Sequence, residues 1–462
     1  MSEENKAQLE KLLVLLEEKK FTQIRSILEE MNAVDAAAIY EDLSEDLTKE
    51  QMLLLFRLMP KELAAEAFAY MDSDTQERLI GVLSDSELGF VMDELNMDDA
   101  ADMIDELPAS VVKRVLRMAR PEDRKVINQL LKYPDDSAGS VLTTEIVDLK
   151  AAMTVEQALK YIRQYGPDKE TIYTCYVTDQ NRHLEGVLSV KDILLGREDD
   201  LIGDLMETNV ISAVTTDDQE EVAQTCAKYD LIALPVVDRE NRLVGIITVD
   251  DVVDIMQQEA TEDIEKMAAI LPSDKPYFKV SVWETWKKRI PWLLLLMISA
   301  TFTGMIITGF ENALAAQTAL TAFIPMLMDT GGNSGSQSSV TVIRALSLGE
   351  ISFSDWFKVI WKEFRVSVLC GLTLALANFA KIMLVDNLLL GGHNSVPVVI
   401  VVCLTLFITV ILAKFLGCTL PMLAKKMGFD PAVMASPFIT TIVDALSLLV
   451  YFGFASWLLG IA

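Results

Sequence analysis

An acidic residue lies inside an apolar segment near the C-terminus of the chain. Asp444 belongs to the segment PFITTIVDALSLLVYF and has apolar neighbours on both sides. An ionisable side chain at membrane depth is rare and commonly marks a substrate or ion pathway. We therefore predict that Asp444 lines an ion path. The alternative is a carboxyl group that is protonated or paired with a neighbouring helix.

A second polar group lies in the segment IPMLMDTGGNSGSQSSVTVIRAL, which begins at Ile324. Its candidate residues are Asp329, Gly331, Gly332, Asn333 and Gln337. Non-helical backbone at membrane depth is tolerated where it lines a cavity or is buried in protein. We predict that the span is interrupted here and that these residues line the ion path. The alternative is a tight helix crossing, which explains the glycines but not the acid and the amides.

The ligands offered by these segments are carboxylate, amide and backbone oxygens. Mg²⁺ gives up its water reluctantly and is usually held through one or two carboxylates. A softer metal would want thiolate or imidazole ligands, and the five cysteines are scattered without a CxxC pair. The residue types therefore favour a hard, partly hydrated cation, and they support neither a zinc site nor a disulfide framework.

Hydroxyl and acidic residues recur with one spacing in the region that precedes the apolar segments. Ser189 lies three residues before Asp192, and Thr248 lies three residues before Asp251. Each pair falls where a predicted strand leads into a helix, so the hydroxyl could bind phosphate at the helix N-terminus and the acid could accept from ribose hydroxyls. The alternative is that Ser189 and Thr248 only cap their helices.

An acidic helix, DIMQQEATEDIEKMAAILP from Asp254, leads to the first apolar segment. Glu259 and Asp263 are four residues apart, and Glu262 and Glu265 are three apart, so each pair shares a helix face. Like charges in these positions are destabilising unless a cation lies between them. We predict a cation-sensitive connecting helix; the alternative is an ordinary solvated acidic face.

The chain has 462 residues and a net charge of −28, and this charge is confined to one part. Residues 290–462 contain eight acidic and eight basic side chains, so residues 1–289 carry the whole excess. An acidic surface attracts cations and repels the phosphates that nucleic-acid binders neutralise, so we expect no nucleic-acid partner. The start, MSEENKAQLE, does not resemble a signal peptide, and we expect the acidic part to stay in the cytosol.

The C-terminal region contains five apolar runs long enough to cross a bilayer. They are Pro291 to Phe310, a run from about Leu314 that is interrupted at Asp329–Ser339, about Phe357 to Val385, about Val396 to Leu423, and about Ala432 to Leu459. Basic residues gather at alternate ends of these runs, which indicates the cytosolic side. We expect five spans in the cell membrane, an N-terminus in the cytoplasm, a C-terminus outside, and Asp444 as the only interior acid.

The region before the spans divides into two. Residues 1 to about 133 are rich in helix formers and are interrupted at Met59-Pro60, Leu107-Pro108 and Arg120-Pro121. This pattern predicts either a stack of helical hairpins or an irregular bundle. Residues 138–260 contain a repeat, LEGVLSVKDIL from Leu184 and LVGIITVDDVV from Leu243, at an offset of 59. The repeat resembles a tandem of CBS domains, a fold that often binds adenine nucleotides.

The fold class expected is therefore multidomain, with all-α, α/β and membrane-helical parts. Its parts are an acidic helical-hairpin N-domain (1–133), CBS domain 1 (138–200), CBS domain 2 (201–258), a connecting (plug) helix (259–288) and a transmembrane domain with five helices (289–462).

The whole chain resembles the MgtE family of magnesium channels and transporters. The most specific marks are Pro325 with DTGGNSGSQSS and the segment DPAVMASPFITTIVDALSLLVYF. The resemblance implies a homodimer with a pore along the subunit interface and Mg²⁺ bound at Asp444. It also implies Mg²⁺ sensing by Asp98, Asp99, Asp102, Asp218, Glu220, Asp230, Asp251, Asp254, Glu259, Glu262 and Asp430.

The expected function is Mg²⁺ uptake that is closed by Mg²⁺ itself. At low Mg²⁺ the acidic domains repel one another; at high Mg²⁺ bound ions compact them and the connecting helix closes the pore. The alternative is a CBS-regulated transporter of another divalent cation or another solute. An intramembrane metalloprotease would need an HExxH motif, which the chain lacks, so we expect no enzyme activity. ATP or another adenine nucleotide is a possible ligand of the CBS domains.

Overall fold

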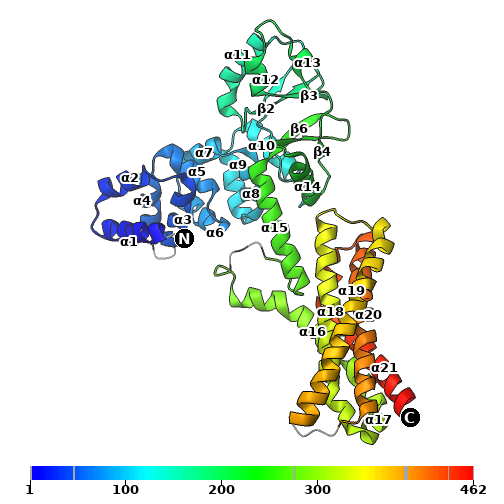
Figure 1. The fold of residues 1–462 in the computed structure, drawn as a ribbon. Helices are drawn as coiled ribbons and strands as arrows, with labels where there is room; N and C mark the ends of the chain where they lie inside the picture. Colours follow the sequence, from blue (N-terminus) through cyan, green and yellow to red (C-terminus); the bar gives the residue numbers. More distant parts are fainter. Residues whose placement is uncertain are drawn as a thin grey trace. The chain divides into compact units, whose positions relative to one another are not determined.

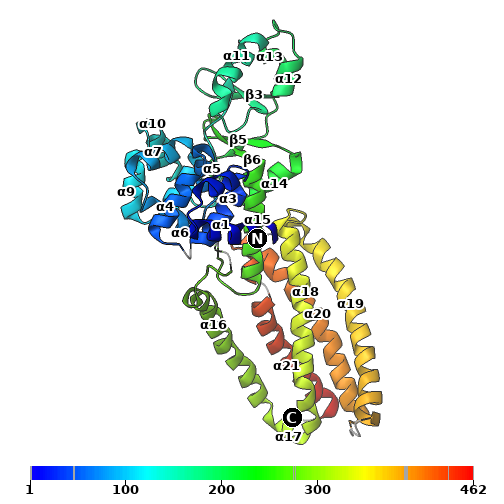
Figure 2. The same ribbon diagram turned by 90° about the vertical axis from the view of Figure 1, so that its left-hand side faces the viewer.

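The computed structural model describes residues 3–44, 47–273, 275, 277–389, 394–434 and 436–460. Its internal contacts divide the chain into two compact units, Met1–Ile255 and Met256–Ala462. Figure 1 shows the helices and strands of both units, and Figure 2 shows them from the side.

The first part of unit 1 is entirely helical in the described residues. Its ten helices are α1 (Glu3–Glu17), α2 (Phe21–Leu28), α3 (Ala33–Ser44), α4 (Lys49–Leu58), α5 (Lys61–Ala69), α6 (Ser73–Ile80), α7 (Asp85–Glu94), α8 (Met97–Glu106), α9 (Ala109–Met118) and α10 (Pro121–Leu130). From α1 to α10 each helix packs against the next but one. This regular pattern is that of a hairpin stack and not of an irregular bundle.

Prolines set the starts of three of these helices, as the sequence predicts, and polar residues cap others. Pro60 and Pro108 occupy the N-cap positions of α5 and α9, and Pro121 is the first residue of α10, where a missing backbone N–H does no harm. Thr48 and Ser84 form capping boxes at α4 and α7. The hydrophobic core of the stack continues into the second repeat of the following region.

Two three-stranded sheets confirm the repeat. The first contains β1 (Asp148–Leu149), β2 (Thr174–Thr178) and β3 (Leu184–Ser189), and the second contains β4 (Ala213–Val214), β5 (Ala233–Val237) and β6 (Leu243–Thr248). In each sheet the first pair is parallel and the second antiparallel. Cys175 pairs with Leu188, and Leu234 pairs with Ile247, so the register repeats at the predicted offset of 59.

Helices complete the two repeats. They are α11 (Val155–Tyr165), η1 (Gly166–Asp168), α12 (Val190–Leu195) and α13 (Ile202–Leu205) in the first, and α14 (Gln219–Tyr229) and α15 (Val249–Met267) in the second. A Cβ at Gly245 would lie 2.2 Å from the carbonyl oxygen of Thr143, so β6 needs glycine where the preceding segment crosses it. Helix α15 is continuous with the acidic connecting segment and ends before Ala269, whose φ is 56°.

Unit 2 is a helical membrane unit. Its elements are α16 (Val282–Gly309), α17 (Glu311–Ala316), η2 (Thr318–Phe323), α18 (Ile324–Ser347), η3 (Phe353–Asp355), α19 (Trp356–Lys381), the π-helix η4 (Ile382–Leu389), α20 (Val396–Lys426), η5 (Pro431–Met434) and α21 (Ser436–Leu459). Among the described residues, four segments are long and apolar enough to cross a membrane: Val282–Gly309, Phe353–Leu389, Val396–Lys426 and Pro431–Leu459.

Helix α18 corrects one prediction about the glycine-rich segment. The expected interruption at Asp329–Ser339 is wrong, because α18 is a continuous α-helix from Ile324 to Ser347 and does not begin near Leu314. Its glycines allow close packing against α20 and α21. A Cβ at Gly417 of α20 would lie 2.3 Å from the carbonyl oxygen of Gly335, so the two backbones nearly touch. Both figures show α18, α20 and α19 side by side.

Candidate functional site

Helix α18 presents one polar face and one glycine face. Asp329, Asn333 and Gln337 follow one another at intervals of four residues and are exposed in unit 2; we call them the polar stripe. The Asn333 side-chain amide donates to the Asp329 carboxylate at 3.1 Å. A polar row on a membrane helix must face protein or water, because lipid cannot satisfy it.

The two predicted glycines lie on the other face. Gly331 is buried where a Cβ would meet Thr409 of α20 at 2.7 Å, and at Gly332 a Cβ would meet Thr440 of α21 at 2.9 Å. Neither position has room for a side chain. The structure shows Gly331 and Gly332 in helix packing, on a face of α18 different from that of the polar stripe, and their predicted place in the ion path stays a prediction.

Asp444 lies on α21 and is half-buried. The residue before it, Val443, packs on the glycine face of α18. The charged group that acts on the Asp444 carboxylate is Asp329 of the polar stripe. Two helices thus place two carboxylates within electrostatic range of each other, and the Asn333 amide bonds to one of them. Their oxygens are of the type that a hard divalent cation prefers.

A second group of acids lies within unit 1, where α8 meets the start of α15. Asp98, Asp99 and Asp102 of α8 interact electrostatically with Asp251 of α15. Glu145 and Glu170, from the loops of the first repeat, belong to the same group. Glu170 accepts a hydrogen bond from the Asn96 side chain at 2.6 Å, and Glu145 accepts from the Met97 backbone at 3.3 Å.

These carboxylates disfavour one another's charge. Burial, followed by repulsion from Asp99 and Asp251, raises the pKa of Asp98 to about 8. Burial and neighbouring acids also raise the pKa of Asp102 and of Glu170 to about 7. The Asp102 side chain is exposed. For this residue we therefore attribute the raised pKa to repulsion from neighbouring acids such as Asp99 and Asp251 more than to burial.

The residue types in this acidic group suit a cation. One carboxylate oxygen of Asp98 is buried without a hydrogen-bond partner, and the largest charge effects on Asp98 and Asp99 come from other acids. Within the described ranges, however, no three Asp, Glu, His or Cys side chains are close enough to enclose a metal ion directly. Mg²⁺ commonly keeps several waters, and this matches a looser set of acids.

The four predicted nucleotide residues bond to one another in pairs at the starts of their helices. Ser189 and Asp192 form a capping box at α12, with the hydroxyl donating to the carboxylate at 2.5 Å. The Thr248 hydroxyl donates to Asp251 at 2.7 Å at the start of α15. The capping alternative therefore holds for Ser189, whose hydroxyl accepts from the Asp192 backbone. At the second junction the Asp251 carboxylate accepts from both the backbone N–H and the hydroxyl of Thr248, and Asp251 also belongs to the acidic group.

The predicted sensor acids of α14 are not brought together. Asp218 is the N-cap and accepts from the Glu220 backbone at 2.8 Å, while Asp230 is the left-handed C-cap. A helix rises 1.5 Å per residue, so eleven residues separate the two ends by about 16 Å. Asp218 and Glu220 cannot share one ion with Asp230 in this chain.

A lysine lies among the predicted sensor acids at the end of α15. Lys266 forms ion pairs with Glu262 and, at 2.7 Å, with Asp430. The Ser347 hydroxyl donates to Asp263 at 3.0 Å. Asp430 also accepts from the Ala432 backbone at 2.7 Å, so it caps the turn that follows it as well. Asp254 and Glu259 lie on the same helix.

The sequence reasoning missed a charged pair inside unit 2. Lys414 of α20 is only 5% exposed, and it contacts Ser338 of α18, which contacts Glu363 of α19. Asp444 is therefore not the only acid in the helical interior. A lysine inside the run VILAKFLGCTL was the available signal, because a buried ammonium requires a partner.

Comparison with known proteins tests the family. The profile described as a divalent cation transporter, MgtE, matches residues 324–454. The MgtE intracellular N domain matches residues 42–136, and CBS domains match 138–198 and 202–258. The magnesium transporter MgtE of Thermus thermophilus is 37% identical over 448 residues, which cover 96% of this chain and 97% of the relative. The chain belongs to the MgtE family.

Further MgtE relatives agree. The magnesium transporter MgtE of Bacillus subtilis is 34% identical over 96% of both chains. The solved cytosolic domain of the Mg²⁺ channel MgtE in complex with ATP is 36% identical, with a TM-score of 0.50 over 53% of this chain and 98% of that structure. The soluble part of a magnesium transporter is 31% identical, with a TM-score of 0.50 over 55% of this chain and 99% of that structure.

The matched ranges divide the candidate residues of this MgtE protein. The transporter match begins at Ile324 and ends beyond Asp444, so it contains the polar stripe. The acids of α8 fall in the N domain match, and Asp251 falls in the second CBS match. MgtE transporters are membrane proteins, and the helical unit carries the membrane-crossing segments.

Proposed function

We propose that this protein conducts Mg²⁺ across the cell membrane along a path lined by Asp444 and the polar stripe. The observation that carries the proposal is the exposed row Asp329–Asn333–Gln337 on α18 with Asp444 on the neighbouring helix. An exposed acid and two amides are unfavourable against lipid. They are favourable when they line a hydrated passage for a cation.

Helix α18 completes a set of five spans in this proposal. Its 24 residues correspond to about 36 Å of helix, which exceeds the roughly 30 Å hydrocarbon core. Its polar row lowers its hydropathy without shortening it. With five spans, the N-terminus lies in the cytoplasm and the C-terminus outside, as the distribution of basic residues supports.

A homodimer with the path at the subunit interface accounts for the exposure of the stripe. Two copies facing each other would cover both stripes from lipid. Two Asp444 carboxylates brought close would also repel each other, and a divalent cation between them removes that repulsion. The dimer would therefore bind a divalent ion more strongly than a monovalent one.

The acidic group of unit 1 supports closure by Mg²⁺. Asp98, Asp99, Asp102 and Asp251 are held together against their mutual repulsion, so an ion that neutralises them favours the compact arrangement. Ion binding to one arrangement shifts the population toward it. At high cytosolic Mg²⁺ the compact cytosolic unit and α15 would close the path. Asp254, Glu259, Glu262 and Asp430, at α15 and the membrane face, would join this response.

Adenine nucleotide is the second regulator in the proposal. The solved cytosolic MgtE domain with ATP supports ATP binding by the CBS pair of this chain. Ser189, Asp192, Thr248 and Asp251 lie at equivalent strand-to-helix junctions in the two repeats. Their hydroxyls and carboxylates would have to serve as caps and as ligands together.

Another divalent cation is the remaining candidate, since the matching profile is described only as a divalent cation transporter. The test is ion uptake into liposomes that contain the full chain, with Mg²⁺, Mn²⁺, Co²⁺ and Ca²⁺ compared. We expect Mg²⁺ uptake in the wild type, none in Asp444→Ala, and inhibition when Mg²⁺ is added on the cytosolic side. Asp386→Asn, which alters an acid paired with Lys381 outside the stripe, is the matched control. Normal Mg²⁺ uptake by folded Asp444→Ala would refute the path.

A further inference from the structure

Three helices of unit 2 meet at a polar contact that none of the proposed ion sites uses. The Ser338 hydroxyl of α18 donates to Glu363 of α19 at 2.7 Å. The same hydroxyl accepts from the Lys414 ammonium of α20 at 3.2 Å. Ser338 and Lys414 are 2% and 5% exposed. We call these three residues the charge bridge.

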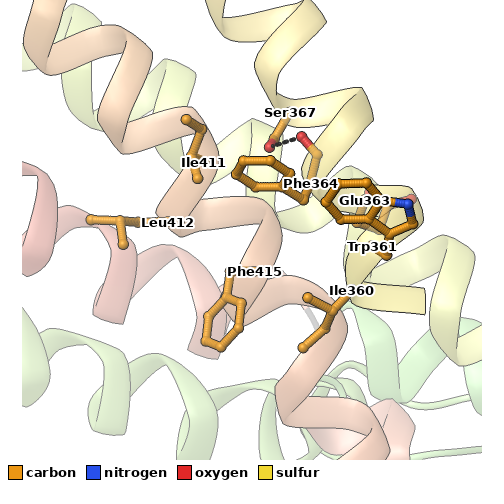
Figure 3. Close-up of a pocket in the computed structure, with 8 residues that line it drawn as sticks. All are labelled: Ile360, Trp361, Glu363, Phe364, Ser367, Ile411, Leu412 and Phe415. Carbon is orange, nitrogen blue, oxygen red and sulfur yellow. Dashed lines mark hydrogen bonds between the residues drawn. The ribbon is translucent and has the colours of Figure 1, made fainter. Parts of the chain in front are cut away.

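The surroundings of Glu363 leave it few other partners. It borders an open pocket of about 520 Å³ between α19 and α20, which is lined mainly by apolar side chains such as Ile360, Phe364, Leu412 and Phe415 (Figure 3). Ser367, also at this pocket, donates to its own helix at the Phe364 carbonyl. The carboxylate thus has apolar groups on one side and Ser338 on the other. In such an environment a charge acts strongly on other charges, and a charge without a partner is highly unfavourable.

The charge bridge lies at the depth of the polar stripe. Ser338 directly follows Gln337, so the two residues differ by about 1.5 Å along the helix axis while occupying different faces of α18. A helix is about 10 Å across, so the Lys414 ammonium is separated from the proposed path by roughly one helix. At that range a bare positive charge in a protein interior lowers the occupancy of a nearby cation site several-fold.

We propose that Glu363 neutralises Lys414 through Ser338, and that this balance sets the affinity of the path for its cation. Lys414 and Glu363 are positioning and affinity-determining residues in this view, and they do not contact the ion. The inference rests on the proposed ion path. It adds that Lys414 and Glu363, which lie outside the path, have opposite effects on its affinity for the cation.

The test is the Mg²⁺ dependence of uptake by the full chain in liposomes, with Asp444→Ala as the baseline. Glu363→Gln leaves the ammonium unbalanced and is expected to raise the Mg²⁺ concentration for half-maximal uptake at least about fivefold. Lys414→Met leaves the carboxylate unbalanced and is expected to lower it. The double variant Glu363→Gln/Lys414→Met is expected to return close to the wild-type value. Ser367→Ala, on the same pocket but outside the charge bridge, is the matched control.

A purely structural contact gives a different pattern. If the three residues only hold the helices together, both single variants shift uptake in the same direction and the double variant is no better than either; this pattern would overturn the proposal. Lys414→Arg keeps the charge and is expected to keep the wild-type concentration dependence even where it lowers the thermal unfolding temperature, so it tests the proposal if Lys414→Met does not fold. If the wild type itself shows no uptake above Asp444→Ala, the ion path fails instead.

Discussion

The ammonium of Lys266 lies 2.7 Å from the carboxylate of Asp430, although the two residues are 164 positions apart. The contact joins the end of α15 to the turn before α21, inside unit 2. Lys266 also pairs with Glu262. Burial disfavours its charge, but the hydrogen bonds to Asp430 and Glu262 raise its pKa above the usual value. A side-chain cation therefore stands between two acids that the family resemblance assigns to Mg²⁺.

Removing this cation should make the same contact depend on a metal. In Lys266→Met, Glu262 and Asp430 face each other unbalanced, and we expect a loss of about 1–2 kcal/mol of stability without Mg²⁺. Mg²⁺ should then raise the unfolding temperature more than it does in the wild type. Thermal unfolding of the full chain with and without Mg²⁺ measures both effects.

The control for Lys266 is Lys358→Met, which breaks an exposed pair with Asp355 and should change neither value by much. Equal Mg²⁺ stabilisation of Lys266→Met and the wild type would show that a divalent ion does not replace the ammonium.

The acidic group of unit 1 predicts an unusual pH dependence. The folded-state pKa values of Asp98 and Glu170 are about 8 and 7, well above the values near 4 expected in the unfolded chain. The folded state therefore holds these protons more tightly, and the stability they provide is complete below about pH 4 and is lost as the pH rises through 7 and 8. Without Mg²⁺, the unfolding temperature of the cytosolic unit should rise as the pH is lowered from 8.5 to 6.

Mg²⁺ should flatten this profile, because it binds the ionised acids and stabilises most at high pH. Asp98→Asn should flatten it as well, whereas Glu94→Gln, which alters an exposed acid at the end of α7, should leave the slope as it is. A stability that rises with pH in Mg²⁺-free buffer would contradict the shared repulsion.

The close crossing of α18 and α20 predicts a strong effect of one methyl group. In Gly417→Ala the new Cβ would start 2.3 Å from the Gly335 carbonyl oxygen, so the helices must move apart. We expect a loss of about 2 kcal/mol or more, measured as a lower unfolding temperature in detergent. Gly304→Ala, where no atom lies within 4 Å of the new Cβ, is the control. Equal stability of the two variants would show that α18 and α20 do not approach closely at Gly417.

The two roles of Thr248 can be separated by comparison with another cap. Thr154→Ala removes a hydroxyl that caps α11, and Thr248→Ala removes a hydroxyl that donates to Asp251 at the start of α15. Each should cost about 1 kcal/mol. Only Thr248→Ala should weaken ATP binding, measured by titration calorimetry on the full chain. Unchanged ATP affinity in Thr248→Ala would leave Thr248 with a capping role alone.

Patterns within one segment were predictable from the sequence, and contacts across segments were not. The 59-residue offset between Leu184 and Leu243 and the breaks at Pro60 and Pro108 involve neighbours in the chain, and the structure confirms them. The grouping of Glu145 and Glu170 with Asp99 depends on how a loop meets a distant helix. No local pattern announces such a contact.

The glycine-rich segment shows why one observation allows two structures. The polar, glycine-rich stretch is costly against lipid, and this favoured an interruption; Gly331 and Gly335 also weaken an isolated helix. In the folded unit the same glycines let α18 pack closely on α20 and α21, and this packing offsets their low propensity. Lys414 and Glu363 were missed for a related reason, since the bridging Ser338 lies on a third helix.

Helix α18 has two sides with different roles, one that packs against other helices and one that carries the polar stripe. Its glycine side rests against α20 and α21 with almost no intervening atoms, and its polar side projects away from that support. A larger side chain on the glycine side of α18 would displace the helix, and its polar side would move outward by a similar distance. In the proposed dimer, residues that do not contact the ion would therefore influence the width of the ion path. A methyl group added on the glycine side of α18 would move its polar side toward the partner subunit and narrow the path.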